Sequence, residues 1–107
     1  MKSSLVYGQK KLDLEVPDNV HLLNMKETPP VPDSEAAVRQ ALESPIRSKP
    51  LRELAKNRHS ACIVISDITR PVPNHLLLPP MLEILEESGI PGQNITILIA
   101  TGMHRPN

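Results

Sequence analysis

Two short runs of β-branched residues, each followed by a polar loop, constrain the fold of this chain most. They occupy residues 63–65 (Ile-Val-Ile) and 95–99 (Ile-Thr-Ile-Leu-Ile). Continuous runs of this kind are typical of parallel strands that are buried on both faces. A segment with helical spacing, Leu76 to Ser88, lies between them. Residues 61–107 are therefore predicted to form a βαβ unit.

The two polar loops are predicted to meet at one edge of this sheet. Parallel strands point the same way, and open α/β sheets bind ligands outside the carboxyl ends of their strands. The first loop carries Asp67, Thr69 and Arg70, and the second carries His104 and Arg105. We expect these five side chains to face one crevice.

The first loop offers groups that suit an anionic ligand. The guanidinium group of Arg70 can bind two oxygens of a phosphate or carboxylate at once. Thr69 can donate to a phosphate oxygen, and Asp67 can accept from a ribose hydroxyl or orient Arg70 or His104. A plainer alternative is that Asp67 and Arg70 pair only to fix the loop.

The second loop places a flexible glycine two residues before His104. An unperturbed histidine titrates near pH ~6.5 and can exchange a proton at neutral pH, which makes His104 a candidate general acid/base. His21, His59 and His75 are expected to have structural or surface roles. The chain contains no zinc-type spacing, P-loop or dinucleotide fingerprint, so we expect no complete metal site within it.

The rest of the chain is predicted to complete an α/β domain. Residues 1–25 resemble a hairpin that covers a core, with a third strand at 20–25. Residues 26–60 form a helical linker, with a helix over 35–43 and a second near Pro50. The fold class expected is a partial Rossmann-like domain, in which helices and the hairpin flank a mixed parallel sheet. Within the 61–107 core, Asn74 is expected to cap a helix that becomes regular only at Pro79 and ends at Gly89.

Composition narrows the classes of function. Positive and negative side chains balance at 12 each, and the chain has no Trp or Phe and one Tyr, so nucleic-acid binding is not expected. No apolar run approaches the ~20 residues that cross a membrane, and no signal-type run follows Met1. These features predict a soluble cytoplasmic protein. The single cysteine, Cys62, is expected to be a small core residue.

The two loops, in this order on consecutive strands, resemble those of the nickel-dependent lactate racemase family. The resemblance rests on residues 66–73 (Ser-Asp-Ile-Thr-Arg-Pro-Val-Pro) and 100–106 (Ala-Thr-Gly-Met-His-Arg-Pro), and it extends over nearly the whole chain. It implies an isomerase: a racemase or epimerase of a lactate-type 2-hydroxy acid. It also implies hydride transfer through a nickel-pincer nucleotide that is tethered to a lysine.

The resemblance also implies roles for individual residues. His104 stands at the position of the first of two acid/base histidines. Asp67, Thr69 and Arg70 match the loop that holds the cofactor nucleotide or the substrate carboxylate, and we expect all three to bind the cofactor. Arg105 follows the catalytic histidine in the family pattern, and we expect it to bind the substrate together with Arg70.

Two departures from the family pattern leave the identity of the 2-hydroxy acid open. Ile68 replaces a histidine and Met103 replaces a phenylalanine that we expect in the closest lactate racemases. The second histidine, the attachment lysine and the protein ligand of nickel would lie beyond residue 107. We therefore expect the N-terminal part of such an enzyme, inactive by itself. An exposed strand edge would favour a homo-oligomer.

Two alternatives remain at this point. The first is a non-enzymatic domain that binds a phosphorylated or carboxylated metabolite through Arg70 and Arg105. The second is a folded fragment whose two loops are disordered.

Overall fold

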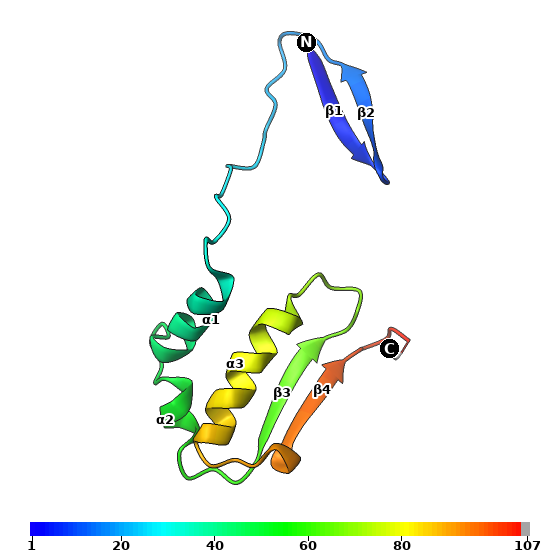
Figure 1. Cartoon of the computed structure of the whole chain (residues 1–107). Coiled ribbons are helices and arrows are strands. Elements are labelled where there is room, and N and C mark those ends of the chain that lie inside the picture. The colour runs from blue at the N-terminus through cyan, green and yellow to red at the C-terminus, as the bar shows by residue number, and fades with distance from the viewer. Residues whose placement is uncertain (106–107) are drawn as a thin grey trace.

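The structure, a computed structural model, describes residues 1–105 (Figure 1). In chain order its elements are β1 (Lys2–Tyr7), β2 (Lys10–Glu15), α1 (Ser34–Glu43), α2 (Leu51–Ala55), β3 (Ala61–Ser66), α3 (Asn74–Glu87), a 3-10 turn (Gly92–Asn94) and β4 (Ile95–Ala100). The strands form two separate pairs, antiparallel β1–β2 and parallel β3–β4. The predicted α/β class, with helices and an N-terminal hairpin beside a parallel pair, is confirmed.

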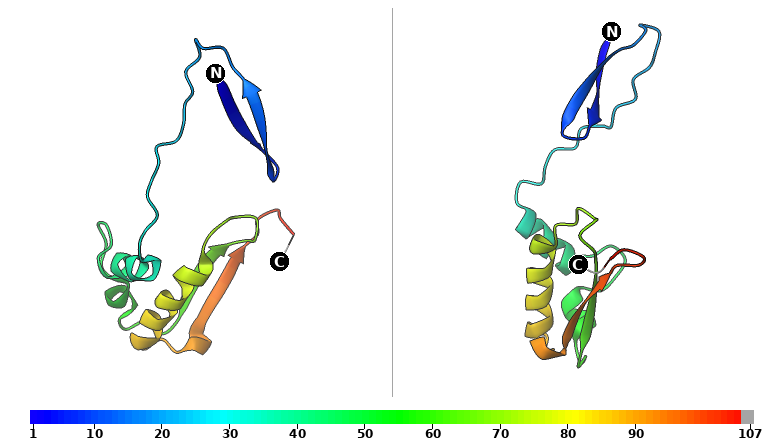
Figure 2. Two further views of the ribbon diagram at one scale, coloured as in Figure 1. Left: turned by 45° about the horizontal axis from the view of Figure 1, so that its top comes forward. Right: turned by 90° about the vertical axis from the view of Figure 1, so that its right-hand side faces the viewer.

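The β3–β4 sheet and its crossover helix α3 form the predicted βαβ unit. The register pairs Ala61 with Ile95 and Ser66 with Ala100, so the two strands begin and end at the same level. α3 lies along one face of this sheet, and α1 and α2 pack against α3 (Figures 1 and 2).

The core lies between α3 and the sheet. Ile63 of β3, Leu85 of α3, Ala55 of α2 and Ile90, which follows α3, form one buried cluster. Each large aliphatic side chain removed from water in this way contributes roughly 1.5–3 kcal/mol. This apolar layer holds β3 and β4 in fixed positions relative to the helices, and so fixes where their outgoing loops begin.

The opposite face of the sheet is uncovered in the described structure. Val64 and Leu98 lie beside each other in register and are 61% and 52% exposed. Cys62 is exposed too and belongs to the same face, because side chains alternate along a strand. The predictions that the strands are buried on both faces and that Cys62 lies in the core are therefore wrong. The described helices pack on the α3 side alone (Figure 2).

α3 is more regular than its prolines predict. It begins at Asn74 and continues through Pro79 and Pro80, so the prediction that regular helix starts at Pro79 is wrong. Asn74 is the first helical residue, not a side-chain cap, and Pro73 precedes it. Pro80 is fully buried, and this packing offsets backbone hydrogen bonds that the prolines cannot form.

Two helix ends have the capping residues that are typical of such positions. Asp33 caps α1, because its side chain accepts a hydrogen bond from the N–H of Ala36 at 2.9 Å. Gly89 follows α3 with φ of 98°. Beyond it, the N–H of Ile90 donates to the carbonyl of Leu85 at 3.1 Å, as in a Schellman motif.

The hairpin stands apart from the core. Figures 1 and 2 show it at one end of an elongated molecule with principal extents of 63 × 34 × 22 Å. Residues 16–33 form no helix or strand, so the third strand predicted at 20–25 is absent. The predicted covering of a core is also wrong within residues 1–105, where Leu5, Tyr7 and Leu12 are exposed. The extended, proline-rich connector separates the hairpin from the helices. No helix in the described part of the chain is long and apolar enough to cross a membrane.

Candidate functional site

The two polar loops leave neighbouring strands at the same edge of the sheet. Because Ser66 pairs with Ala100 at the ends of β3 and β4, the loops that begin at Asp67 and Thr101 start side by side. This is the carboxyl edge of a parallel sheet, where open α/β folds bind ligands. The predicted meeting of the two loops is therefore confirmed.

Asp67 is the buried carboxylate of this edge, with 5% of its surface exposed. Its Oδ1 accepts hydrogen bonds from the backbone N–H of Thr69 at 3.1 Å and from the Thr69 hydroxyl at 2.6 Å. Its Oδ2 lies 2.5 Å from Nδ1 of His104. Aspartate side chains often accept from the backbone two residues further on. The Asp-x-Thr spacing therefore explains the two hydrogen bonds from Thr69 to Oδ1, whereas the contact of Oδ2 with His104 depends on the second loop.

His104 reaches Asp67 from the second loop. Gly102 has φ of 58°, a left-handed conformation that glycine adopts readily. The N–H of His104 donates to the carbonyl of Thr101 at 3.0 Å, which closes the turn. The His104 side chain is 49% exposed, and no residue among 1–105 hydrogen-bonds to its Nε2. One ring nitrogen is thus held by the protein, and the other, which has no partner in the described part of the chain, can meet a ligand.

Arg70 supplies the unpaired positive charge of the site. Its backbone N–H donates to the carbonyl of Asp67 at 3.1 Å. Its guanidinium group makes no ion pair or hydrogen bond with any described residue. The alternative in which Asp67 and Arg70 pair only to fix the loop is therefore wrong, since the Asp67 carboxylate binds Thr69 and His104 instead.

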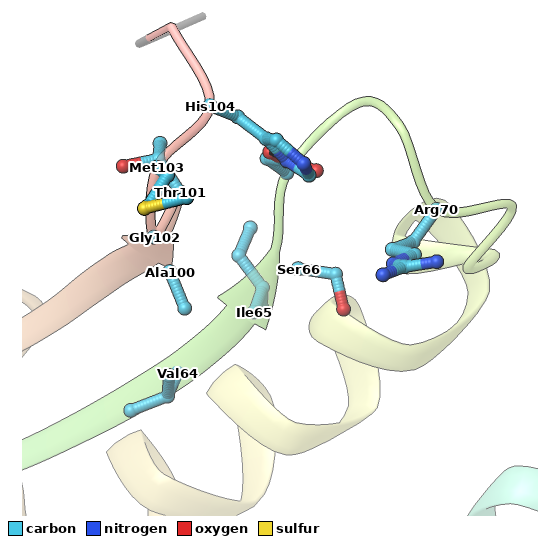
Figure 3. Close-up of a pocket in the computed structure, with 10 residues that line it drawn as sticks. Val64, Ile65, Ser66, Arg70, Ala100, Thr101, Gly102, Met103 and His104 are labelled. Atoms are coloured by element: carbon cyan, nitrogen blue, oxygen red, sulfur yellow. Dashed lines mark hydrogen bonds and ion pairs between the residues drawn. The ribbon is translucent and has the colours of Figure 1, made fainter.

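A pocket of about 400 Å³ opens between the loops, lined in part by Asp67, Arg70 and His104. Figure 3 shows Arg70 and His104 on opposite sides of the end of β3. Small-molecule sites typically have volumes of roughly 300–1,000 Å³. The pocket thus combines a cation that can hold an anionic group with an imidazole that can move a proton.

The predicted site residues do not all reach this pocket. Thr69 contacts it through Asp67, whereas Arg105 is exposed and does not line it. The role of Arg105 in substrate binding stays a prediction. Ser66 and Thr101, for which the sequence predicts no role, also line the pocket. The available signal was their position at the junction of strand and loop. Pro106 lies outside the described residues.

Hydrogen bonding lowers the pKa of the Asp67 carboxyl below its ordinary value. The largest cause is the hydroxyl of Thr69, followed by the hydrogen bond with His104, and burial opposes both. Hydrogen bonds to the charged form of a carboxyl favour that form. Asp67 is therefore an ionised acceptor at neutral pH.

Asp67→Asn should destabilise the chain more at neutral pH than at acidic pH. The folded-state pKa lies below the unfolded value of ~3.9. The contribution of the carboxylate is therefore present above that value and is lost as the pH falls through the folded pKa. Urea unfolding of both proteins at about pH 6 and about pH 3 measures the difference in free energy of unfolding. A difference of the same size at both pH values would contradict this expectation.

Comparison with known proteins places these features in a family. Residues 7–107 match the family described as "Lactate racemase N-terminal domain". A lactate racemase from Lactiplantibacillus plantarum is 47% identical over 70 residues, which cover 65% of this chain and 16% of that protein. A lactate racemase from Thermoanaerobacterium thermosaccharolyticum is 36% identical over an alignment of 110 positions, which covers 92% of this chain and 24% of that protein.

A solved structure agrees with the sequence comparisons. The lactate racemase apoprotein from Thermoanaerobacterium thermosaccharolyticum matches with a TM-score of 0.85 and 36% identity, covering 100% of this chain and 25% of that one. The chain therefore spans a quarter or less of the length of these relatives.

Proposed function

This chain belongs to the lactate racemase N-terminal domain family, and we propose on that basis that it supplies one half of the acid/base machinery of a lactate-type 2-hydroxy acid racemase. The observation that carries the proposal is the hydrogen bond between His104 Nδ1 and the buried Asp67 carboxylate, inside a pocket that also contains Arg70. An imidazole held by the protein and a guanidinium without an ion-pair partner among residues 1–105 line the same pocket, which suits a substrate that has both a hydroxyl and a carboxylate.

His104 is proposed to move the proton of the substrate hydroxyl. With Nδ1 bound to Asp67, Nε2 accepts that proton as the C2 carbon is oxidised, and returns it when the carbon is reduced again. A second histidine, implied by the family resemblance and not identified in this chain, would serve the opposite face. Arg70 is proposed to hold the carboxylate of the 2-hydroxy acid, or a phosphate of the cofactor nucleotide, through its two-pronged guanidinium group.

The implied cofactor fits this site in part. When bound, a nickel-pincer nucleotide would supply the acceptor for the C2 hydride. The unpaired guanidinium of Arg70 suits its phosphate. Residues 1–105, however, contain no group of three or more His, Cys, Asp or Glu side chains that could hold a metal ion, and no lysine lines the pocket. Nickel ligation and lysine attachment therefore require residues other than those described.

A chimeric enzyme tests the proposal in a complete protein. The 107 residues replace the matching segment of the Thermoanaerobacterium thermosaccharolyticum lactate racemase, and the chimera is loaded with nickel-pincer nucleotide. We expect it to interconvert the enantiomers of lactate or of another acid in a panel of 2-hydroxy acids. The intact relative is the control. A folded, cofactor-loaded chimera that turns over no panel member would contradict the proposal and favour metabolite binding without turnover.

Three further expectations stay predictions. They are that these 107 residues are inactive by themselves, that the protein is cytoplasmic and that it forms a homo-oligomer. Racemisation by the isolated chain with added cofactor would contradict the first of them.

A further inference from the structure

Asp67, Thr69 and His104 form a closed hydrogen-bond network, and two of its members, Asp67 and His104, line the pocket. Both oxygens of the Asp67 carboxylate are occupied, Oδ1 by the two donors of Thr69 and Oδ2 by His104. Asp67 is buried, so water does not replace these partners easily. The carboxylate therefore has one orientation, which the protein itself determines.

This network dictates which ring nitrogen of His104 carries the proton. An ionised carboxylate only accepts hydrogen bonds, so Nδ1 at 2.5 Å from Oδ2 must be the donor. A neutral imidazole has one N–H, and its other nitrogen then carries the lone pair. In this arrangement the lone pair lies on Nε2, the nitrogen that has no partner among residues 1–105.

The hydroxyl of Thr69 is committed to the network and not to a ligand. A threonine hydroxyl has a single donor, and that donor is used by Oδ1 of Asp67 at 2.6 Å. The expectation that Thr69 donates to a nucleotide phosphate would require this bond to break. The backbone N–H of Thr69 donates to the same oxygen, so the two bonds together fix the plane of the carboxylate.

We propose that Thr69 and Asp67 are positioning residues that hold His104 in its Nδ1-protonated tautomer and so leave Nε2 to exchange the proton. The tautomer itself follows from the hydrogen bonds alone. Its consequence for turnover rests on the proposed racemase function. Thr69 acts here through Asp67 and through its own hydroxyl oxygen, which lies 3.4 Å from Nδ1 of His104. Neither contact requires Thr69 to touch the substrate.

The tautomer can be read directly by NMR of the full 107-residue chain with ¹⁵N-labelled histidines, at alkaline pH. The chain has four histidines, and His104→Gln identifies the signal of His104. In the wild type we expect Nδ1 to give the protonated, pyrrole-like shift and Nε2 the pyridine-like shift. In Thr69→Val and Asp67→Ala we expect the two shifts to move toward a mixture of tautomers. Thr69→Ser, which restores the hydroxyl, should restore the wild-type pattern.

A matched control removes a different hydroxyl from the same sheet. Thr96 lies in β4 and is exposed, so Thr96→Val should leave the His104 shifts unchanged. A wild-type His104 protonated on Nε2, or a tautomer that is identical in wild type, Thr69→Val and Asp67→Ala, would overturn the proposal. If Asp67→Ala does not fold, the Thr69→Val comparison still decides the question.

Kinetics in the chimera provide a second readout. Thr69→Val should lower kcat on the order of 10-fold with little change in KM, as is common when a residue that orients a reacting group is lost, and Thr69→Ser should recover it. A rise in KM with unchanged kcat would instead indicate ligand binding by Thr69 and would contradict the positioning role. If the chimera is inactive with the wild-type sequence as well as with both Thr69 variants, the proposed function is contradicted. The NMR result does not depend on the activity of the chimera.

Discussion

Replacing His104 with alanine in the cofactor-loaded chimera should lower kcat for racemisation by about 10²–10⁴-fold, the usual contribution of a positioned acid/base. In the proposed reaction His104 accepts a proton in one direction and donates it in the other, so interconversion of both enantiomers should slow. KM should change little, because Arg70, and not His104, is proposed to hold the anionic group. Steady-state rates from each enantiomer measure both quantities.

His75→Ala is the matched control for this experiment. His75 is exposed in the first turn of α3 and does not line the pocket, so its loss should leave kcat unchanged. Equal losses in the two variants would show that the effect comes from a general change in the protein. An unchanged rate in His104→Ala would remove this residue from the reaction.

Ile90→Ala should destabilise the folded chain by about 2–5 kcal/mol, the range for removing most of a buried aliphatic side chain. Ile90 is 1% exposed and belongs to the cluster with Ile63 and Leu85. Its N–H also closes the turn that ends α3 and leads toward β4. The truncation would leave a cavity where the crossover helix meets the sheet. Urea unfolding monitored by circular dichroism measures the loss of free energy.

The same substitution of isoleucine by alanine at an exposed site serves as the control. Ile46 is 93% exposed, so Ile46→Ala should change the free energy of unfolding by less than about 0.5 kcal/mol. If the two variants were destabilised equally, the cluster around Ile90 would not be the core that holds α3 against the sheet.

The sequence was sufficient to predict the βαβ unit and the edge at which its loops meet. Short β-branched runs and a helical spacing between them are local signals, and the geometry of parallel strands then brings Asp67 and His104 together without further information. What covers each face was not predictable in this way. Alternation along the hairpin, or an apolar run such as that around Cys62, shows that a face can be buried but not what would lie on it.

The hydrogen-bond partners within the site were harder to predict, because the Asp67 carboxylate had more than one possible cationic partner. Asp67 could have paired with Arg70 or with His104, and residue types do not decide between them. The Asp-x-Thr turn does, since both donors of Thr69 orient the carboxylate. Arg105 shows the opposite case: it directly follows His104, yet it does not line the pocket. Neighbours in a turn need not point the same way. The predicted start of regular helix at Pro79 was wrong for a related reason. Packing of the buried Pro80 outweighs the local tendency of proline to interrupt a helix.

The uncovered face of the β3–β4 sheet contains a side chain that can be labelled selectively. Cys62 is the single cysteine of the chain and is exposed on that face beside Val64. A fluorophore attached to its thiol through a maleimide would therefore carry one label at one known place. Its emission and its rate of attachment would sense whatever comes to lie over the sheet, whether another segment of a longer protein or a second molecule. The face of the sheet that residues 1–105 leave uncovered is therefore a site at which assembly can be followed with a single label.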